Sequence, residues 1–462
     1  MTNLGLVQTM VKTDESKIER DKKKRSWLAE LLLGIITLVV VDFYLFPTTF
    51  LFFPFANTKL CLAIIGVAIL SFFGAATMKG RAKKWFIVLI PIGCAVSLIS
   101  FVSCTYNGTS DYTYATYIFS MATWFFGAYF VYSWLRYFYG DATVIRICNF
   151  IIIVCFLQCL IALSVKFNIT VQHFVDSIID TRWMRGVKRM YGIGAELDTA
   201  GIKFSIALVM ISYILMNSVG KLSNLKLSLY IVAFLFILIV GNMMARTTTM
   251  GGVVALFYMI YKFKPLNSQK AKDQAKLYSW FGLITLIIVF VVSVFYASNG
   301  DFREQIRFAF EGFFSYFERG EFMTASTNTL KSMYVWPESL KTWIIGDGYI
   351  VNPRYDPYYI GPVTEGYYMN TDVGYLRFIF YFGLIGLIIF SSLFFVVANL
   401  CIKKHPKYMG LILLMLLINF MVWFKVSTDC FFIFALLLLS DEEITKADEL
   451  GNEDHNLSLQ KQ

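Results

Sequence analysis

Twelve long apolar runs constrain this chain more than any other feature of its sequence. Most are long enough for a helix to cross about 30 Å of hydrocarbon, although the eighth and twelfth are short. The runs fall at residues 27–47, 60–78, 85–104, 114–135, 144–165, 199–219, 227–245, 247–261, 277–298, 371–400, 407–424 and 426–440. Of the 462 residues 57% are hydrophobic and 16% are charged, against about 25% charged in soluble domains. We therefore predict an all-α polytopic membrane protein with about twelve transmembrane helices, which excludes soluble enzymes, disordered chains and secreted disulfide scaffolds.

The Lys and Arg residues between the runs predict the orientation, because short cytoplasmic loops are enriched in both. Residues 1–26 hold seven of them, and every second connection after that is basic. The short connections on the other side hold only Lys59, Arg246 and Lys425. We therefore expect both termini in the cytoplasm, which agrees with an even number of spans.

We expect three parts: a basic cytoplasmic tail at 1–26, a single transmembrane domain at 27–440 and a cytoplasmic tail at 441–462. The transmembrane domain includes two longer outer loops, at 166–198 and 299–370. Basic residues there do not contradict the orientation, since long loops translocate largely regardless of charge. The first apolar run lacks a small-residue cleavage site, so we expect it to remain as an anchor.

Other features exclude several classes of function. The eight cysteines lie almost wholly in apolar runs, and we interpret them as small buried apolar residues. Most of the charges behind the net +10 border apolar runs, which argues against nucleic-acid binding. There is no P-loop, zinc-hydrolase or serine-elbow pattern, so energy-coupled transport and hydrolysis have no support.

The outer loop at 299–370 is rich in Tyr, Trp and Pro. Its first part, 302–321, repeats Phe, Ile and Tyr at helical spacing, and we expect one amphipathic helix on the membrane surface. Aromatic faces with scattered carboxylates and amides suit sugar rings. An aromatic belt at the membrane interface is the alternative.

The outer loop at 166–198 carries four basic residues within eight positions: Arg182, Arg185, Lys188 and Arg189. The planar donor fork of Arg matches phosphate oxygens, and several together can hold a pyrophosphate. Attraction to anionic lipid headgroups explains the same residues.

Arg246 stands where two apolar runs meet almost without a polar loop, and it is followed by three Thr and by Gly251-Gly252. An ionisable side chain at membrane depth is costly and indicates a functional site, whereas snorkelling to the interface is the alternative. We expect the two glycines to let a ligand approach the backbone.

The tenth run opens with Thr371-Asp372, either of which is well placed to cap the helix. Capping alone would explain Asp372. Arg377 lies five residues further on, and an offset of five positions on a helix does not put two side chains on the same face. We therefore expect both residues to meet other groups, with no local partner for Arg377.

Together these features resemble the O-antigen polymerase and O-antigen ligase superfamily of bacterial membrane glycosyltransferases, and the resemblance covers most of the chain. It consists of the span number, the large late outer loop and several short motifs. The motifs are Arg189 with Gly192 and Gly194, Arg246-Thr247, Gly346-Asp347-Gly348-Tyr349, the segment from Asn370 to Leu376, and Gly383-Leu384-Ile385-Gly386.

The resemblance implies a GT-C-like fold in the bacterial cytoplasmic membrane. It also implies an enzyme of O-antigen, lipopolysaccharide, capsule or exopolysaccharide synthesis, whose donor is an oligosaccharide on undecaprenyl pyrophosphate. Membrane lipid, a chain-length regulator and a flippase are the further implied partners, and no metal or other cofactor is expected. The alternative is that Glu196 and Asp198 form an acidic pair that binds a metal ion.

The resemblance also assigns roles to individual residues. The pyrophosphate is assigned to Arg246, Arg189, Arg377 and Arg185. The general base is assigned to Asp372, with Glu196 as the second candidate, and the glycan to Tyr349, Tyr368 and Asn370. Ligases of this superfamily place a His before the late helix, and this chain has none there, which favours a polymerase over a ligase. A flippase of lipid-linked oligosaccharide is the rival from another class, although we find no internal repeat of the kind common in transporters.

Overall fold

The fold is built almost wholly from helices. The computed structural model describes residues 26–77, 80–181, 189–263, 269–352 and 366–442. Within these ranges there is no strand, and the only extended pairings are isolated bridges.

Eight helices in the described part are long and apolar enough to cross a membrane, by length and composition. They are α2 (Trp27–Leu45), α4 (Gly80–Asn107), α5 (Tyr117–Tyr139), α6 (Val144–Phe167), α8 (Leu197–Asn217), α9 (Asn224–Met244), α11 (Gln269–Ser298) and α16 (Gly374–Lys404). This confirms the prediction of an all-α multi-pass membrane protein.

Four of the twelve predicted spans are not among these eight. These are α3 (Thr58–Thr77), α10 (Thr248–Tyr261), α17 (Met409–Val422, after the 3-10 turn η3 at Pro406–Tyr408) and α18 (Phe431–Leu439). At 1.5 Å per residue, the nine residues of α18 reach only about 14 Å, so this helix cannot span a bilayer alone. All nine are buried, and the non-helical chain that leads to α18 is bonded within the protein: the Cys430 N–H donates to Asn419 Oδ1 at 2.9 Å. Irregular backbone is tolerated at membrane depth where protein surrounds it.

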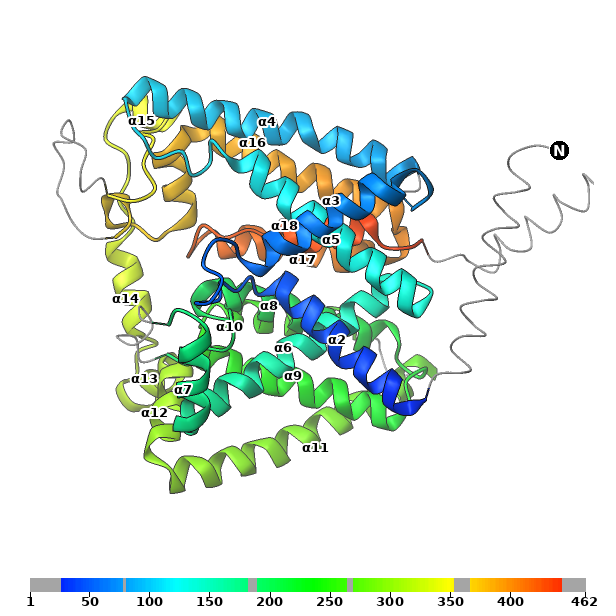
Figure 1. Cartoon of the computed structure of the whole chain (residues 1–462). Helices are drawn as coiled ribbons and strands as arrows, with labels where there is room; N and C mark the ends of the chain where they lie inside the picture. The colour runs from blue at the N-terminus through cyan, green and yellow to red at the C-terminus, as the bar shows by residue number, and fades with distance from the viewer. Residues whose placement is uncertain (1–25, 78–79, 182–188, 264–268, 353–365, 443–462) are drawn as a thin grey trace, which may run out of the picture.

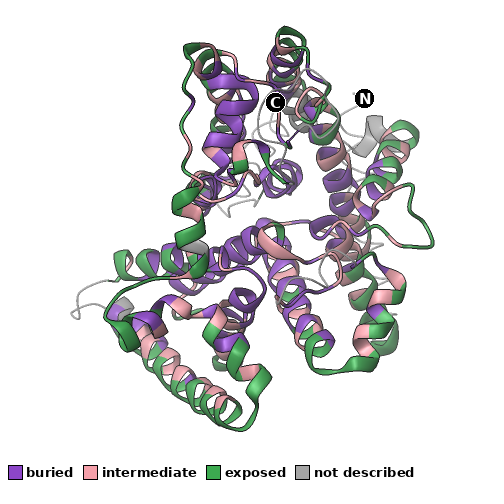
Figure 2. Ribbon diagram, turned by 90° about the vertical axis from the view of Figure 1, so that its left-hand side faces the viewer, coloured by how far each residue is buried: buried purple, intermediate pink, exposed green. Residues whose placement is uncertain are grey.

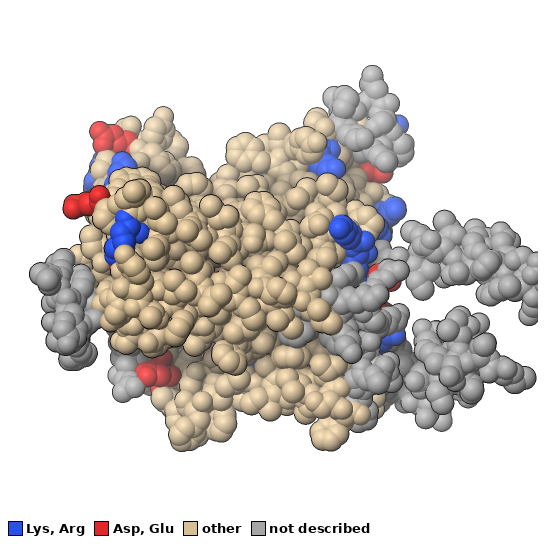
Figure 3. Space-filling model, turned by 90° about the horizontal axis from the view of Figure 1, so that it is seen from above, with Lys and Arg blue, Asp and Glu red and all other residues tan. Residues whose placement is uncertain are grey.

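The charged residues gather at the two ends of the helix bundle. Figure 3 shows Lys, Arg, Asp and Glu at opposite ends of one face, with a band of uncharged residues between them. Figure 1 shows α7 (Ile169–Ile178), α12 (Gly300–Ala309), α13 (Glu311–Arg319) and α14 (Ala325–Ser332) at one end, which we call the loop end. Such a band suits a bilayer, whose core disfavours charge.

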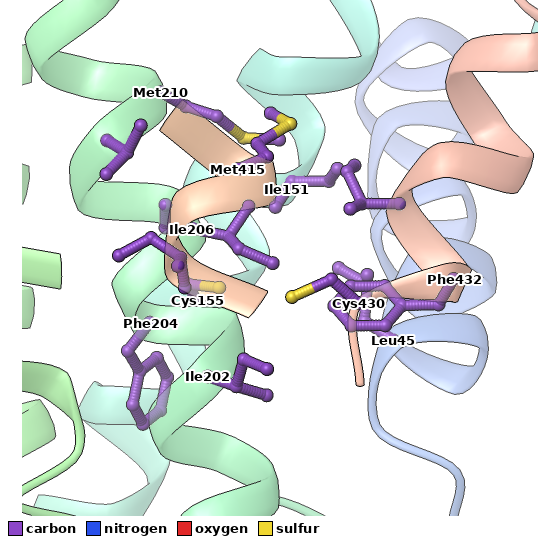
Figure 4. Packing of buried hydrophobic residues seen from close by; sticks show 14 of the residues in the cluster. Leu45, Ile151, Cys155, Ile202, Phe204, Ile206, Met210, Met415, Cys430 and Phe432 are labelled. Carbon is purple, nitrogen blue, oxygen red and sulfur yellow. The ribbon is translucent and has the colours of Figure 1, made fainter. Parts of the chain in front are cut away.

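Helix α8 forms the centre of the core. In its most apolar 18-residue window 94% of the residues are buried, against 6% for the corresponding window of α11 at the edge. Figure 2 shows the buried residues gathered toward the interior. In Figure 4, Ile206 and Met210 of α8 pack with residues of other helices, among them Cys155 of α6 and Met415 of α17.

The interpretation of the cysteines as buried apolar residues holds for six of the eight. Cys61 is partly exposed and Cys94 is exposed, and both lie in apolar helices.

Helix α16 is broken near its first third, at Phe382 and Gly383. Gly383 has φ 67° and ψ −174°, a conformation that only glycine adopts readily. The break frees backbone carbonyls, and the outer loop satisfies them: the Asp347 N–H donates to the Phe380 carbonyl at 2.5 Å and the Gly348 N–H to the Tyr381 carbonyl at 3.1 Å. The Gly346-Asp347-Gly348 motif therefore anchors the outer loop in the broken helix.

The amphipathic helix expected over 302–321 is in fact two helices. Helix α12 ends at Ala309 and α13 begins at Glu311, with Phe310 between them outside the helical conformation. The loop continues through α14, the short α15 (Leu340–Ile344) and the 3-10 turn η2 (Tyr368–Asn370) to the start of α16. This path leads from α12, whose Phe308 contacts Arg246, to Asp372.

Candidate functional site

Arg246 lies in the short step between α9 and α10, where the sequence places it at the end of a span. Its guanidinium stacks on Phe308 of α12, 4.1 Å from the ring centroid, and its Nε donates to the Phe308 carbonyl at 3.1 Å. It also forms an ion pair with Glu311 at 2.5 Å. Arg189 reaches the same ring at 5.6 Å. Two of the predicted pyrophosphate ligands thus meet around one aromatic ring.

Small residues hold the Arg246-Thr247 step against α8. A Cβ on Gly201 of α8 would collide with the Thr247 side chain, and one on Gly251 of α10 would collide with Ser205. The Ser205 hydroxyl donates to the Thr247 carbonyl at 3.0 Å. The expectation that Gly251 and Gly252 leave room for a ligand is wrong, because helix packing fills that space.

Beside this step lies a compact charged group that the sequence did not single out. Lys425, in the segment after α17, donates to Asp198 at 2.6 Å and to the Thr247 hydroxyl at 2.8 Å. Asp198 also accepts a hydrogen bond from Thr247. The sequence marked its members only separately: Lys425 as a cation in a short connection expected on the outer side, and Asp198 as half of an alternative metal pair.

Asp372 and Arg377 form an ion pair at 3.6 Å, contrary to our expectation. The expectation treated both as helical, but α16 begins only at Gly374 with Val373 as its cap, so Asp372 lies before the helix. No side chain caps this helix, and the capping prediction for Asp372 is therefore wrong as well.

Arg377 is nine-tenths buried, and its guanidinium lies 3.8 Å from the Tyr367 ring centroid. Its Nε is buried and has no hydrogen-bond acceptor among the described residues. A donor left unpaired inside a protein is costly. Arg377 therefore retains one donor for a ligand.

Asp372 belongs to the same charged cluster as Lys425 and Asp198. Burial raises the pKa of the Asp372 carboxyl to about 6, and the charges of Arg377, Lys425 and Arg189 oppose this rise while that of Asp198 adds to it. Three segments far apart in the sequence, at 189–198, 372–377 and 425, therefore act on one another electrostatically at the loop end.

Glu196 lies outside that group. It precedes α8 without a side-chain capping bond, and burial raises the pKa of its carboxyl to about 7, with Lys203 opposing the rise and Asp180 adding to it. Its principal charged neighbour is thus Lys203, deeper along α8, and Asp372 is the carboxylate that lies among the arginines.

The predicted glycan-binding residues lie in the outer loop near its contact with the broken part of α16. We call this contact, which Asp347 and Gly348 make with α16 and Tyr368 makes with Asp347, the lock. Tyr368 is buried, its ring stacks on Tyr349 at 5.3 Å, and its hydroxyl donates to Asp347 at 3.3 Å. Asn370 is exposed, with φ 54°. Of the three, Asn370 presents most of its surface. Arg185 lies outside the described residues.

In the described part of the chain no group of three or more His, Cys, Asp or Glu could hold a metal ion. A scan against protein-family models and searches of the curated proteins and of the solved structures found no match for this chain.

Proposed function

We propose that the chain is a polymerase of lipid-linked oligosaccharide repeat units. It would cross the bacterial cytoplasmic membrane twelve times, with both termini in the cytoplasm and the loop end outside. The hydroxyl oxygen of the next lipid-linked repeat unit attacks the anomeric carbon of the growing chain. The bond from that carbon to the pyrophosphate oxygen breaks, undecaprenyl pyrophosphate leaves and the hydroxyl proton passes to a base.

The observation that supports this proposal is the charged cluster at the loop end. It combines Arg189, Arg246, Arg377 and Lys425 with the carboxylates of Asp198, Glu311 and Asp372. Preorganised cations stabilise the negative charge that develops on a departing pyrophosphate. Arg246 and Arg189 beside Phe308 suit that role, and the Nε of Arg377, which has no acceptor in the described part of the chain, is a further donor.

Asp372 suits the role of general base. A carboxyl with a pKa of about 6 is ionised at neutral pH, and it accepts a proton more readily than one with an ordinary value. Glu196, with a pKa of about 7, meets the same requirement but lies away from the arginines. Asp372 is therefore the better candidate.

The alternatives differ in acceptor or in chemistry. A ligase would transfer the glycan to another lipid or to a protein. The two described histidines are poorly placed for the role that ligases give theirs: His405 is bonded to Ser440 beyond the far end of α16, and His173 is exposed on α7. A flippase would move the donor without breaking a bond.

A deletion strain separates these functions. Under the polymerase proposal single repeat units still reach the surface while long chains disappear, whereas loss of every surface glycan would indicate a flippase. In that strain we expect Arg246→Ala at normal protein levels to yield no polymer. Arg246→Lys should yield shorter or less polymer, because the ammonium keeps the charge but loses the planar fork.

The matched control is Arg146→Ala, because Arg146 also pairs with a carboxylate, that of Asp141, but lies at the start of α6, away from the loop end. We expect this variant to polymerise normally. Wild-type chain length in the Arg246→Ala strain would contradict the assignment of Arg246 to the pyrophosphate.

A further inference from the structure

The guanidinium that we assign to the donor pyrophosphate is already bound to a carboxylate. Glu311 begins α13, and both its oxygens are used: Oε2 accepts from Arg246 at 2.5 Å and Oε1 accepts from the Ala325 N–H at 3.1 Å. Ala325 begins α14. One side chain therefore connects Arg246 to the starts of two outer-loop helices.

A groove of about 750 Å³ adjoins this contact. Arg246, Phe308 and Glu311 lie along its wall, together with residues of α12, α13 and α14. The side chain of Arg246 is 12% exposed and that of Glu311 is 34% exposed, so the carboxylate is the more accessible partner. A ligand that enters from the loop end therefore meets Glu311 beside Arg246.

Carboxylate and phosphate oxygens make the same charge-assisted hydrogen bonds to a guanidinium. A largely buried arginine needs an anionic partner, since an unpaired buried charge is strongly destabilising. Two anions on one guanidinium repel each other. Glu311 and a phosphate group are therefore alternative partners for Arg246.

We propose that the Glu311 carboxylate binds Arg246 in place of the pyrophosphate while no donor is bound. The arriving pyrophosphate displaces Glu311 and thereby releases the starts of α13 and α14. This inference rests on the proposed function. When undecaprenyl pyrophosphate departs, Glu311 returns to Arg246 and helps to clear the site for the next donor. The contact thus links donor occupancy to the position of the outer loop.

The test compares Glu311→Gln with the wild-type chain in lipid nanodiscs, using inorganic pyrophosphate as the probe in titration calorimetry. The amide removes the competing charge and keeps one acceptor oxygen, which can accept from the Ala325 N–H or from Arg246 but not from both. We expect pyrophosphate to bind about fivefold more tightly, because the competing ion pair no longer masks Arg246. Asp141→Asn removes a carboxylate that pairs with Arg146 and lies outside the groove, so it should bind as the wild type does.

Hydrogen exchange gives a second readout that does not depend on the variant. In the wild-type chain, pyrophosphate should accelerate exchange at the Ala325 amide, whose acceptor is Glu311. Protection that is unchanged on binding would overturn the displacement, even if Glu311→Gln failed to fold.

The outcomes also separate this inference from the proposed function. Wild-type or weaker pyrophosphate affinity in Glu311→Gln would overturn the inference, while loss of polymer in Arg246→Ala would leave the polymerase standing. If the wild-type chain bound no pyrophosphate and Arg246→Ala polymerised normally, this inference and the assignment of Arg246 would fall. The polymerase proposal itself would fall only if the deletion strain still made long chains or lost every surface glycan.

Discussion

The ion pair between Lys425 and Asp198 allows the sharpest test of how the loop end is held together. It joins the segment after α17 to the first turn of α8, and Thr247 adds the step between α9 and α10. Lys425→Met replaces the cation with an unbranched apolar side chain and leaves the Asp198 carboxylate with Thr247 as its hydrogen-bond partner among the described residues.

Removing one partner of a fully buried ion pair costs about 3–5 kcal/mol. Here the side chains are 16% and 17% exposed, so some water reaches them. The N-terminus of α8 also favours a carboxylate in its first turn, by up to about 1 kcal/mol. We therefore expect Lys425→Met to lower the free energy of unfolding by about 2–3 kcal/mol.

The measurement is equilibrium unfolding in mixed micelles with increasing dodecyl sulfate. The double variant Lys425→Met with Asp198→Asn leaves no unpaired charge, and it should recover to within about 1 kcal/mol of the wild type. Arg307→Met breaks an exposed pair in the outer loop and should unfold like the wild type. If Lys425→Met were as stable as the wild type, the pair would not hold the three segments together.

Three further predictions concern α16 and the candidate base. Gly383→Ala should lower the free energy of unfolding by about 3 kcal/mol, because the backbone conformation at position 383 suits only glycine and the new Cβ would collide with the Ile344 carbonyl. Gly282→Ala is the control, because Gly282 has open space around it. Polymerisation rate should fall as pH drops through about 6 if Asp372 must be ionised, and through about 7 if the base is Glu196. The raised pKa of Asp372 also favours its protonated form in the folded chain, so its contribution to stability should decrease as pH rises from about 4 to about 6.

The spans could be predicted from the sequence because the length of an apolar run determines whether a helix can cross a bilayer. The exceptions to the charge bias were also informative. Arg246 and Lys425 both lie in ion pairs at the loop end, and Lys59 lies 4.2 Å from the Trp124 ring centroid. The partners were not predictable: Lys425 and Asp198 are 227 positions apart, and no local pattern reveals such a pair.

The errors at Asp372 and Arg377 share one physical cause. An apolar run shows where hydrocarbon surrounds the chain, but it does not show where the helix begins. The run was taken to start at 371, whereas α16 starts at Gly374, which packs so closely on the Trp423 and Val426 carbonyls that a Cβ would collide with them. Long-range packing therefore set the boundary that decided whether the two side chains could meet.

The backbone is strained beside the candidate base. Among the described residues, the non-glycine residues with positive φ are Leu197, Met369 and Asn370. Leu197 lies between Glu196 and Asp198, and the other two immediately precede Thr371 and Asp372. Such conformations cost about 1–2 kcal/mol each and persist only where surrounding contacts impose them.

The contacts that impose this strain come from the lock between the outer loop and α16. Tyr368 is buried against Tyr349, its N–H donates to the Ile350 carbonyl at 3.1 Å and its hydroxyl donates to Asp347. Asp347 is in turn bonded through its N–H to the broken turn of α16. Because both ends of the strained segment join the same helix, the turn before Asp372 cannot relax without opening the lock. The break at Gly383 therefore helps to hold the Asp372 carboxylate beside Arg377.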